Sequence, residues 1–168
     1  VGLAASGATP FVLGALEETR RRGAVTVAVT CVPGSPVAAA AHIAITPVVG
    51  PEVLTGSTRL KAGTAQKLIC NMLTTAAMVR LGKVYSNLMV DVQPRNRKLA
   101  ARAVRVVAAA ADCAPDAARR WLEQGGGNAK VAIVMARGGV DRVGAEALLA
   151  AAGGHVRRAL AAAGRGGR

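Results

Sequence analysis

The chain has 168 residues and a mass of 16.9 kDa, enough for one domain with its own core, or for one domain with a small addition. Hydrophobic residues make up 52% of it and charged residues 18%, which excludes a largely disordered protein. No stretch approaches the roughly 18 consecutive apolar residues of a membrane-spanning helix, so we expect a soluble protein without a membrane partner. Cys31, Cys70 and Cys113 are odd in number and lack metal-ligand spacing, which predicts reduced core thiols in a cytoplasmic protein.

The net charge is +13, and it is unevenly distributed. The first 58 residues are neutral overall, so the whole excess lies after them. We favour arginines on solvated helix surfaces, with attraction of anionic small molecules as the milder functional interpretation. The only aromatic residues are Phe11, Tyr85 and Trp121, too few for a platform that stacks nucleic-acid bases, and we expect no nucleic-acid partner.

The first half of the chain alternates strand and helix patterns. Val1 opens directly into a strand-like run, which indicates the back part of a longer protein. We predict strands over residues 1–5, 25–31 and 43–49. Between them we predict a helix from Pro10 to about Arg22, with Phe11, Leu13 and Leu16 on its apolar faces, and a short helix within 33–41. This order is typical of a doubly wound parallel α/β sheet.

The pattern changes at Gly50, where a polar loop over residues 50–58 leads into a long helix that Gly82 ends. Its apolar residues recur at the helical period: Leu60, Leu68, Ile69, Met72, Leu73, Ala76 and Val79. Residues 85–94 are predicted to be irregular and 95–111 helical, with no strand afterwards.

The tail contains an internal repeat of 27 residues, in which residues 118–133 align with 145–160. Trp121 falls on Leu148, Gly127 on Gly154 and Lys130 on Arg157. Each unit predicts a helix, a glycine turn and a second helix, with Trp121 anchoring the core of the first.

Two hydroxyl-rich loops are candidate phosphate sites. Ser6-Gly7-Ala8-Thr9 lies between a strand and a helix, where backbone N–H groups and the helix dipole favour an anion. The alternative is that Ser6 or Thr9 only caps the helix.

The second loop, over residues 50–58, brings Glu52, Thr55 and Ser57 to the start of the long helix, and Lys61 follows. Here the alternative makes Ser57 or Thr58 the helix cap and Lys61 a solvated side chain. His42 and His155 are interpreted as loop or cap residues rather than catalytic ones.

Three segments carry a family resemblance: residues 52–67, 71–75 and 82–92. They resemble the N-acetylmuramic acid 6-phosphate etherase family, and the related glucokinase regulatory protein shares the first block. The resemblance implies a sugar isomerase (SIS) domain followed by a helical region. We therefore assign residues 1–94 to the C-terminal part of a SIS domain, 95–163 to a helical tail and 164–168 to a frayed end.

The resemblance also implies a function. The family is a cytoplasmic lyase that removes D-lactate from N-acetylmuramic acid 6-phosphate, giving N-acetylglucosamine 6-phosphate during cell-wall recycling. It implies a homodimer and neither a metal nor a redox cofactor. The substrate-binding residues it suggests are Ser6, Gly7, Thr9, Glu52, Thr55, Ser57 and Lys61.

The sequence departs from the family at the catalytic groups. The two glutamates that serve as acid and base in similar enzymes lie upstream of the segment that matches Val1, so the catalytic residues stay unassigned. Ala4 stands where the family often has another serine. The alternative function is a non-catalytic regulatory protein that binds a sugar phosphate.

Overall fold

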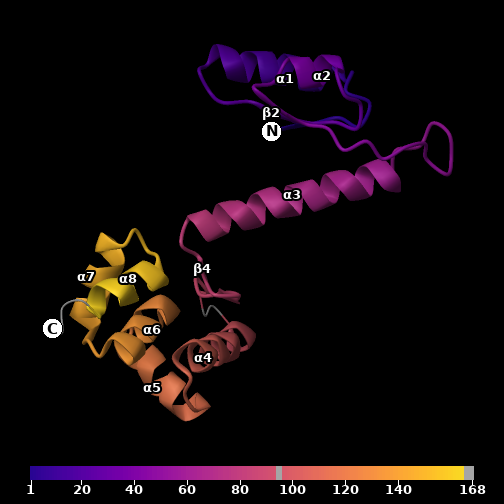
Figure 1. The fold of residues 1–168 in the computed structure, drawn as a ribbon. Coiled ribbons are helices and arrows are strands. Elements are labelled where there is room, and N and C mark those ends of the chain that lie inside the picture. Colours follow the sequence, from indigo (N-terminus) through magenta and orange to yellow (C-terminus); the bar gives the residue numbers. More distant parts are fainter. Residues whose placement is uncertain (94–95, 165–168) are drawn as a thin grey trace. The chain divides into compact units, whose positions relative to one another are not determined.

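A computed structural model describes residues 1–93 and 96–164, which form two compact units, Val1–Thr74 and Thr75–Arg168 (Figure 1). The predicted α/β class is confirmed, with a small parallel sheet followed by several helices. The domain boundary predicted between residues 94 and 95 lies outside the described residues, and so does the frayed end predicted at 164–168 except for Gly164.

The first unit is built on three short parallel strands, β1 (Gly2–Leu3), β2 (Val27–Val29) and β3 (Ile43–Ile45), in the order β1-β2-β3. Gly2 pairs with Ala28, and Val27 pairs with Ile43. The strands occur in the predicted order but are shorter than predicted. Helices α1 (Pro10–Arg21) and α2 (Pro36–Ala39) connect them and lie on one side of the strands (Figure 1).

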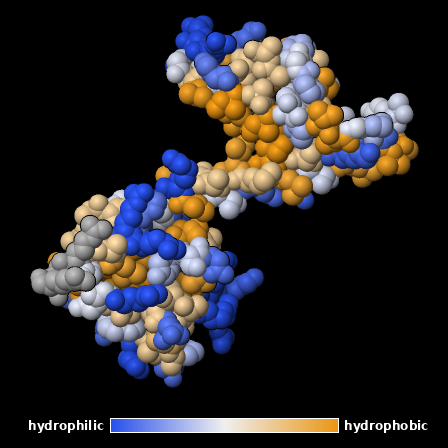
Figure 2. Space-filling model, viewed as in Figure 1, coloured by the Kyte–Doolittle hydropathy of each residue, from blue (hydrophilic) through white to orange (hydrophobic). Residues whose placement is uncertain are grey.

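This unit buries little of its apolar surface. One cluster consists of Ala4, Leu16, Ala28 and Val37, with Val12 and Leu13 packed against it. The prediction that Phe11 contributes to a packed helix face is wrong, because its side chain is 83% exposed. Hydrophobic residues are accordingly visible at the surface of the unit (Figure 2).

The long helix, α3 (Lys61–Arg80), is likewise less buried than its pattern predicts. Gln66 Nε2 donates to Val29 O at 3.1 Å, and Ala62 and Ile69 are buried. Most of the predicted apolar face is instead exposed, because no described element covers it: Leu68, Met72, Leu73 and Val79. Gly82 follows the helix at φ 71°, as expected of a terminating glycine.

The second unit begins with an antiparallel hairpin of β4 (Val84–Tyr85) and β5 (Leu88–Met89). The prediction that residues 85–94 are irregular is therefore wrong at its start. A two-residue turn joins the strands, and Ser86 takes a positive φ of 54° there.

The residues described after the hairpin form five helices: α4 (Arg97–Ala111), α5 (Pro115–Gln124), α6 (Ala129–Gly138), α7 (Arg142–Ala151) and α8 (Val156–Ala163). In the described residues after β5 all regular elements are helices, as predicted. They share one core that includes Val107, Ile133, Val134 and Val156, each fully buried, and Trp121 packs against it.

The 27-residue repeat is confirmed in the backbone. Gly127 and Gly154 have φ values of 77° and 78°. Gly127 N donates to Leu122 O at 2.8 Å, and Gly154 N donates to Leu149 O at 2.7 Å, so the two turns share one hydrogen-bond pattern. The three cysteines are free but only half-buried, and of the three the core cluster of the helical unit includes Cys113 among the residues packed against it.

Candidate functional site

The carboxyl ends of the three parallel strands lead into three loops at one edge of the sheet. The loop after β1 holds Ser6 to Thr9, the loop after β2 runs from Thr30 to Ser35, and the chain after β3 leads to the 50–58 loop. Open α/β sheets bind ligands at this edge, because backbone N–H groups and helix N-termini gather there.

Gly7 holds the first two loops together. Its N–H donates to Ala4 O at 3.0 Å, and its carbonyl accepts from Val37 N at 2.9 Å. Its φ is +69°, and a Cβ placed on it would lie 2.1 Å from the Ser35 side-chain oxygen. Only glycine fits this close approach of the loops.

The hydroxyls of Ser6 and Thr9 lie at the surface of the first loop. Thr9 is the N-cap residue of α1 by backbone position, yet its side chain makes no capping hydrogen bond. The Ser6 side-chain oxygen accepts only a long bond of 3.4 Å from Ala8 N. The alternative in which these hydroxyls exist to cap the helix is therefore unsupported for Thr9 and weak for Ser6.

Two buried hydroxyls behind this loop were not predicted from the sequence as site residues. Thr30 and Ser35 are 0% and 5% exposed. Thr30 Oγ1 donates to Ala5 O at 3.3 Å, and Ser35 Oγ lies 3.5 Å from Thr30 Oγ1. They tie the second loop to the first. A threonine at the end of a predicted strand and a serine just before Pro36 were the signals that could have identified them.

Glu52 caps α3 from nine residues upstream. Its two carboxylate oxygens accept from Lys61 N and from Ala62 N, each at 3.0 Å. Hydrogen bonds from Ala62 N–H and Lys61 N–H hold the pKa of Glu52 below its ordinary value. The side chain that caps α3 is thus Glu52. The alternative, in which Ser57 or Thr58 is the cap, is wrong, and Ser57 Oγ instead accepts from Arg59 N at 3.4 Å.

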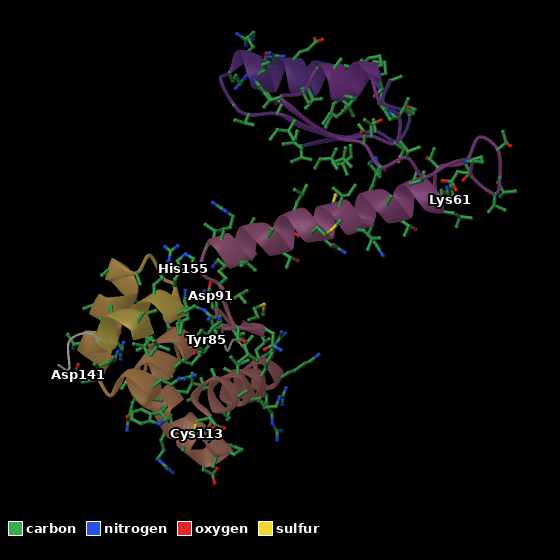
Figure 3. All side chains as sticks on the ribbon, in the orientation of Figure 1. Lys61, Tyr85, Asp91, Cys113, Asp141 and His155 are labelled. Carbon is green, nitrogen blue, oxygen red and sulfur yellow. The ribbon has the colours of Figure 1, made fainter. Side chains whose placement is uncertain are left out.

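The charge on Glu52 reaches the loop after β2. Burial, and secondly the negative charge of Glu52, raise the pKa of the Cys31 thiol. Glu52 and the start of α3, where Figure 3 labels Lys61, therefore lie at the sheet edge that carries Ser6 and Thr9. Thr55 is exposed further along the 50–58 loop.

The two histidines lie away from this edge. His42 Nδ1 lies 2.8 Å from Thr26 Oγ1 and accepts from Thr26 N at 3.1 Å, before the amino ends of β2 and β3. His155 belongs to the second unit, where it begins α8. Both positions agree with the structural interpretation given from the sequence.

Within residues 1–93 and 96–164 no three His, Cys, Asp or Glu side chains are grouped so as to hold a metal ion. None of the helices described is both long and apolar enough to cross a membrane.

Comparison with known proteins agrees with the geometry. Residues 1–76 match the family described as the SIS domain. The chain is 58% identical over 160 residues to "N-acetylmuramic acid 6-phosphate etherase 2" of Vibrio cholerae, covering 95% of this chain and 52% of that protein. It is 60% identical over 161 residues to the "N-acetylmuramic acid 6-phosphate etherase" of Burkholderia lata, covering 96% and 54%.

A protein of the same name from Rhizobium rhizogenes is 56% identical over 162 residues, covering 96% of this chain and 53% of the relative. The resemblance inferred from the sequence is confirmed by these matches. The chain spans about half the length of the curated relatives it matches.

Proposed function

We propose that this chain, a relative of the N-acetylmuramic acid 6-phosphate etherases with a SIS domain match over residues 1–76, supplies a substrate-binding part of a carbon–oxygen lyase. The reaction removes D-lactate from the C3 ether of N-acetylmuramic acid 6-phosphate and gives N-acetylglucosamine 6-phosphate in peptidoglycan recycling. The observation that carries the proposal is the 58% identity over 160 residues. No observation favours the regulatory alternative.

The reaction needs a base and an acid. Opening of the sugar ring acidifies the C2 proton, which a base removes, while an acid protonates the ether oxygen as its bond to C3 breaks. D-lactate leaves, and addition of water at C3 completes the conversion. Two carboxyl groups with separated pKa values suit these roles.

Glu52 does not suit either role. Each of its oxygens accepts a backbone N–H of α3, and its lowered pKa keeps it ionised and occupied as a hydrogen-bond acceptor. It can instead hold the 50–58 loop, with Thr55 and Ser57, at the sheet edge. We infer that Glu52 positions binding groups and that the proton transfers use residues outside this chain.

The phosphate of the substrate is proposed to bind at the first loop. Ser6 and Thr9 are exposed hydroxyls beside the N-terminus of α1, where the positive end of the helix dipole favours an anion. Gly7 fixes the loop, and Lys61 supplies a cation at the start of α3.

A chimera tests the binding assignment. The aligned segment of the Vibrio cholerae relative is replaced by this chain, and D-lactate release from N-acetylmuramic acid 6-phosphate is measured. The chimera should be active, whereas the 168-residue chain alone should release none. An inactive but folded chimera, or turnover by the chain alone, contradicts the proposal.

The chimera also separates phosphate binding from structure. Replacing Ser6 and Thr9 by alanine removes two hydrogen bonds to a charged acceptor, each worth about 1.5–3 kcal/mol, so substrate affinity should fall at least tenfold. Ser57→Ala in the same chimera tests separately whether the hydroxyl of the second loop also contributes to substrate affinity. An unchanged affinity with a lowered melting temperature would remove Ser6 and Thr9 from the site.

We further propose a cytoplasmic homodimer that completes the site across its interface. Exposed apolar side chains in the first unit support association, among them Leu3, Leu68 and Met72. Light scattering at concentrations on the order of tens of micromolar should show association of the isolated chain as well. A monomer under those conditions would count against this proposal.

A further inference from the structure

A second concave site lies wholly within the helical unit. It is a pocket of about 390 Å³ between the hairpin strand β4 and the helices α6 and α8. Tyr85, Arg137 and Arg157 supply its polar side chains, and Gly138 and Leu160 are among its other lining residues. No carboxylate is among the described residues that line it.

Arg137 is held in place by uncharged partners. Its Nη1 donates to Tyr85 Oη at 3.0 Å and to Ala110 O at 3.2 Å, and its guanidinium carbon lies 6.0 Å from the centre of the Tyr85 ring. These contacts fix the guanidinium without neutralising it. Its remaining N–H donors keep their capacity for an anion.

The internal repeat shows what Arg157 lacks. Its counterpart in the first repeat, Lys130, lies 3.6 Å from Asp91 and donates to Gly154 O at 3.5 Å. The same carboxylate also pairs with Lys83. For Arg157, in contrast, the described residues provide no carboxylate partner.

We propose that this pocket binds the phosphate group of a small molecule between Arg157 and Arg137, with the ligand taking the place that Asp91 takes beside Lys130. Two guanidinium groups match a doubly charged phosphate, because each can donate two parallel hydrogen bonds to its oxygens. The volume also admits a small group attached to that phosphate. Inorganic phosphate and a sugar phosphate share this chemistry. The site is separate from the sheet edge, and it does not depend on the proposed function.

Tyr85 gives a direct probe of this pocket, because it is the only tyrosine in the chain. The 168-residue chain is labelled with 3-fluorotyrosine, and its single ¹⁹F resonance is followed at pH 7. Inorganic phosphate is added at constant ionic strength, with sodium chloride as the balancing salt. We expect a saturable shift of the resonance.

Arg157→Gln should weaken phosphate binding at least tenfold, as expected for the loss of charged hydrogen bonds. Arg158→Gln is the matched control, because it removes the same charge from the next residue of α8, and Arg158 does not line this pocket. It should leave the titration unchanged. Both arginines are exposed, so neither change should unfold the helix, and circular dichroism melts check this.

A second titration, with N-acetylglucosamine 6-phosphate, identifies the source of the phosphate. Saturation by both compounds supports a site for phosphate esters, and saturation by inorganic phosphate alone supports a site for the free ion. A shift that does not saturate, or that Arg157→Gln leaves unchanged, overturns the proposal. So does a response abolished by the double change of Ser6 and Thr9 to alanine, because the probe would then be reporting on the sheet edge.

Discussion

The two units bury their apolar residues to very different extents. The core of the helical unit contains seventeen buried residues, whereas the cluster in the sheet unit contains four. Both segments are rich in hydrophobic residues, and most of the large exposed ones precede residue 75. Helices adjacent in sequence cover one another in the second unit. In the first unit most of the apolar face of α3 is exposed, and no described strand pairs with the side of β1 away from β2. Hydrophobic periodicity thus predicts a face that can be buried, and only the surrounding elements decide whether it is.

The largest expected effect tests this contrast in burial. Ile133→Ala empties a fully buried position in the helical core and should cost about 2–5 kcal/mol of that unit's unfolding free energy. Leu68→Ala, at a side chain that is 49% exposed, is the matched control and should cost well under half as much. Amide hydrogen exchange of each unit, recorded at increasing urea concentration, measures the loss of unfolding free energy that each substitution causes. Equal losses would show that α3 is packed as well as the core.

A second comparison concerns backbone at the sheet edge, where two glycines share one conformation. Gly7 and Gly34 both have φ +69°, but a Cβ on Gly7 would clash with Ser35. Apart from Gly34 and its two chain neighbours, no described residue has an atom within 4 Å of a Cβ on Gly34. Gly34→Ala should cost about 1–2 kcal/mol from left-handed strain alone. Gly7→Ala should cost about 1–3 kcal/mol more from overpacking, measured by thermal melts. Similar losses of stability from Gly7→Ala and Gly34→Ala would mean that the loops after β1 and β2 can move apart to accommodate the added methyl group.

The features predicted from the sequence were mainly local ones. Three features depend on residues close together in the sequence and were predicted correctly: the glycine turns of the repeat, the order of the strands, and the end of α3 near Gly82. The cap from Glu52 was missed because it joins residues nine or ten apart. The hairpin was missed because its strands are two residues long, although Ser86-Asn87 between apolar residues carried a turn signal.

Stability within the helical unit should differ between its two repeats. The Asn128 side chain accepts from Lys130 N at 3.0 Å and Val131 N at 3.4 Å, whereas His155, its repeat counterpart, makes no side-chain cap. Asn128→Ala should therefore cost about 1 kcal/mol, and His155→Ala distinctly less. Amide exchange in the first turns of α6 and α8 gives the comparison. A larger loss of stability from His155→Ala would mean that the packing of His155 beside Gly82 contributes more than the Asn128 cap.

The smallest effect concerns two carboxylates, one in each unit, whose pKa values are lowered by different means. The hydrogen bond from Lys83, and the charge of Lys130, lower the pKa of Asp91, whereas backbone N–H groups of α3 lower that of Glu52. A lowered pKa means that each contributes stability above its unfolded value, about 3.9 for Asp and 4.3 for Glu, and loses it as pH falls through the folded value.

Salt should separate the two causes. Raising the ionic strength from about 0.1 to 1 M shortens the screening length from about 10 to 3 Å, which weakens the attraction of the two lysines for Asp91. Hydrogen bonds from uncharged backbone groups are not screened in this way, so the pKa of Glu52 should barely change. Carboxyl ¹³C titrations at both salt concentrations should therefore show the pKa of Asp91 rising toward its ordinary value while that of Glu52 stays low. A parallel rise of both would mean that the charge of the Lys61 side chain, rather than the backbone N–H groups at the start of α3, keeps the pKa of Glu52 low.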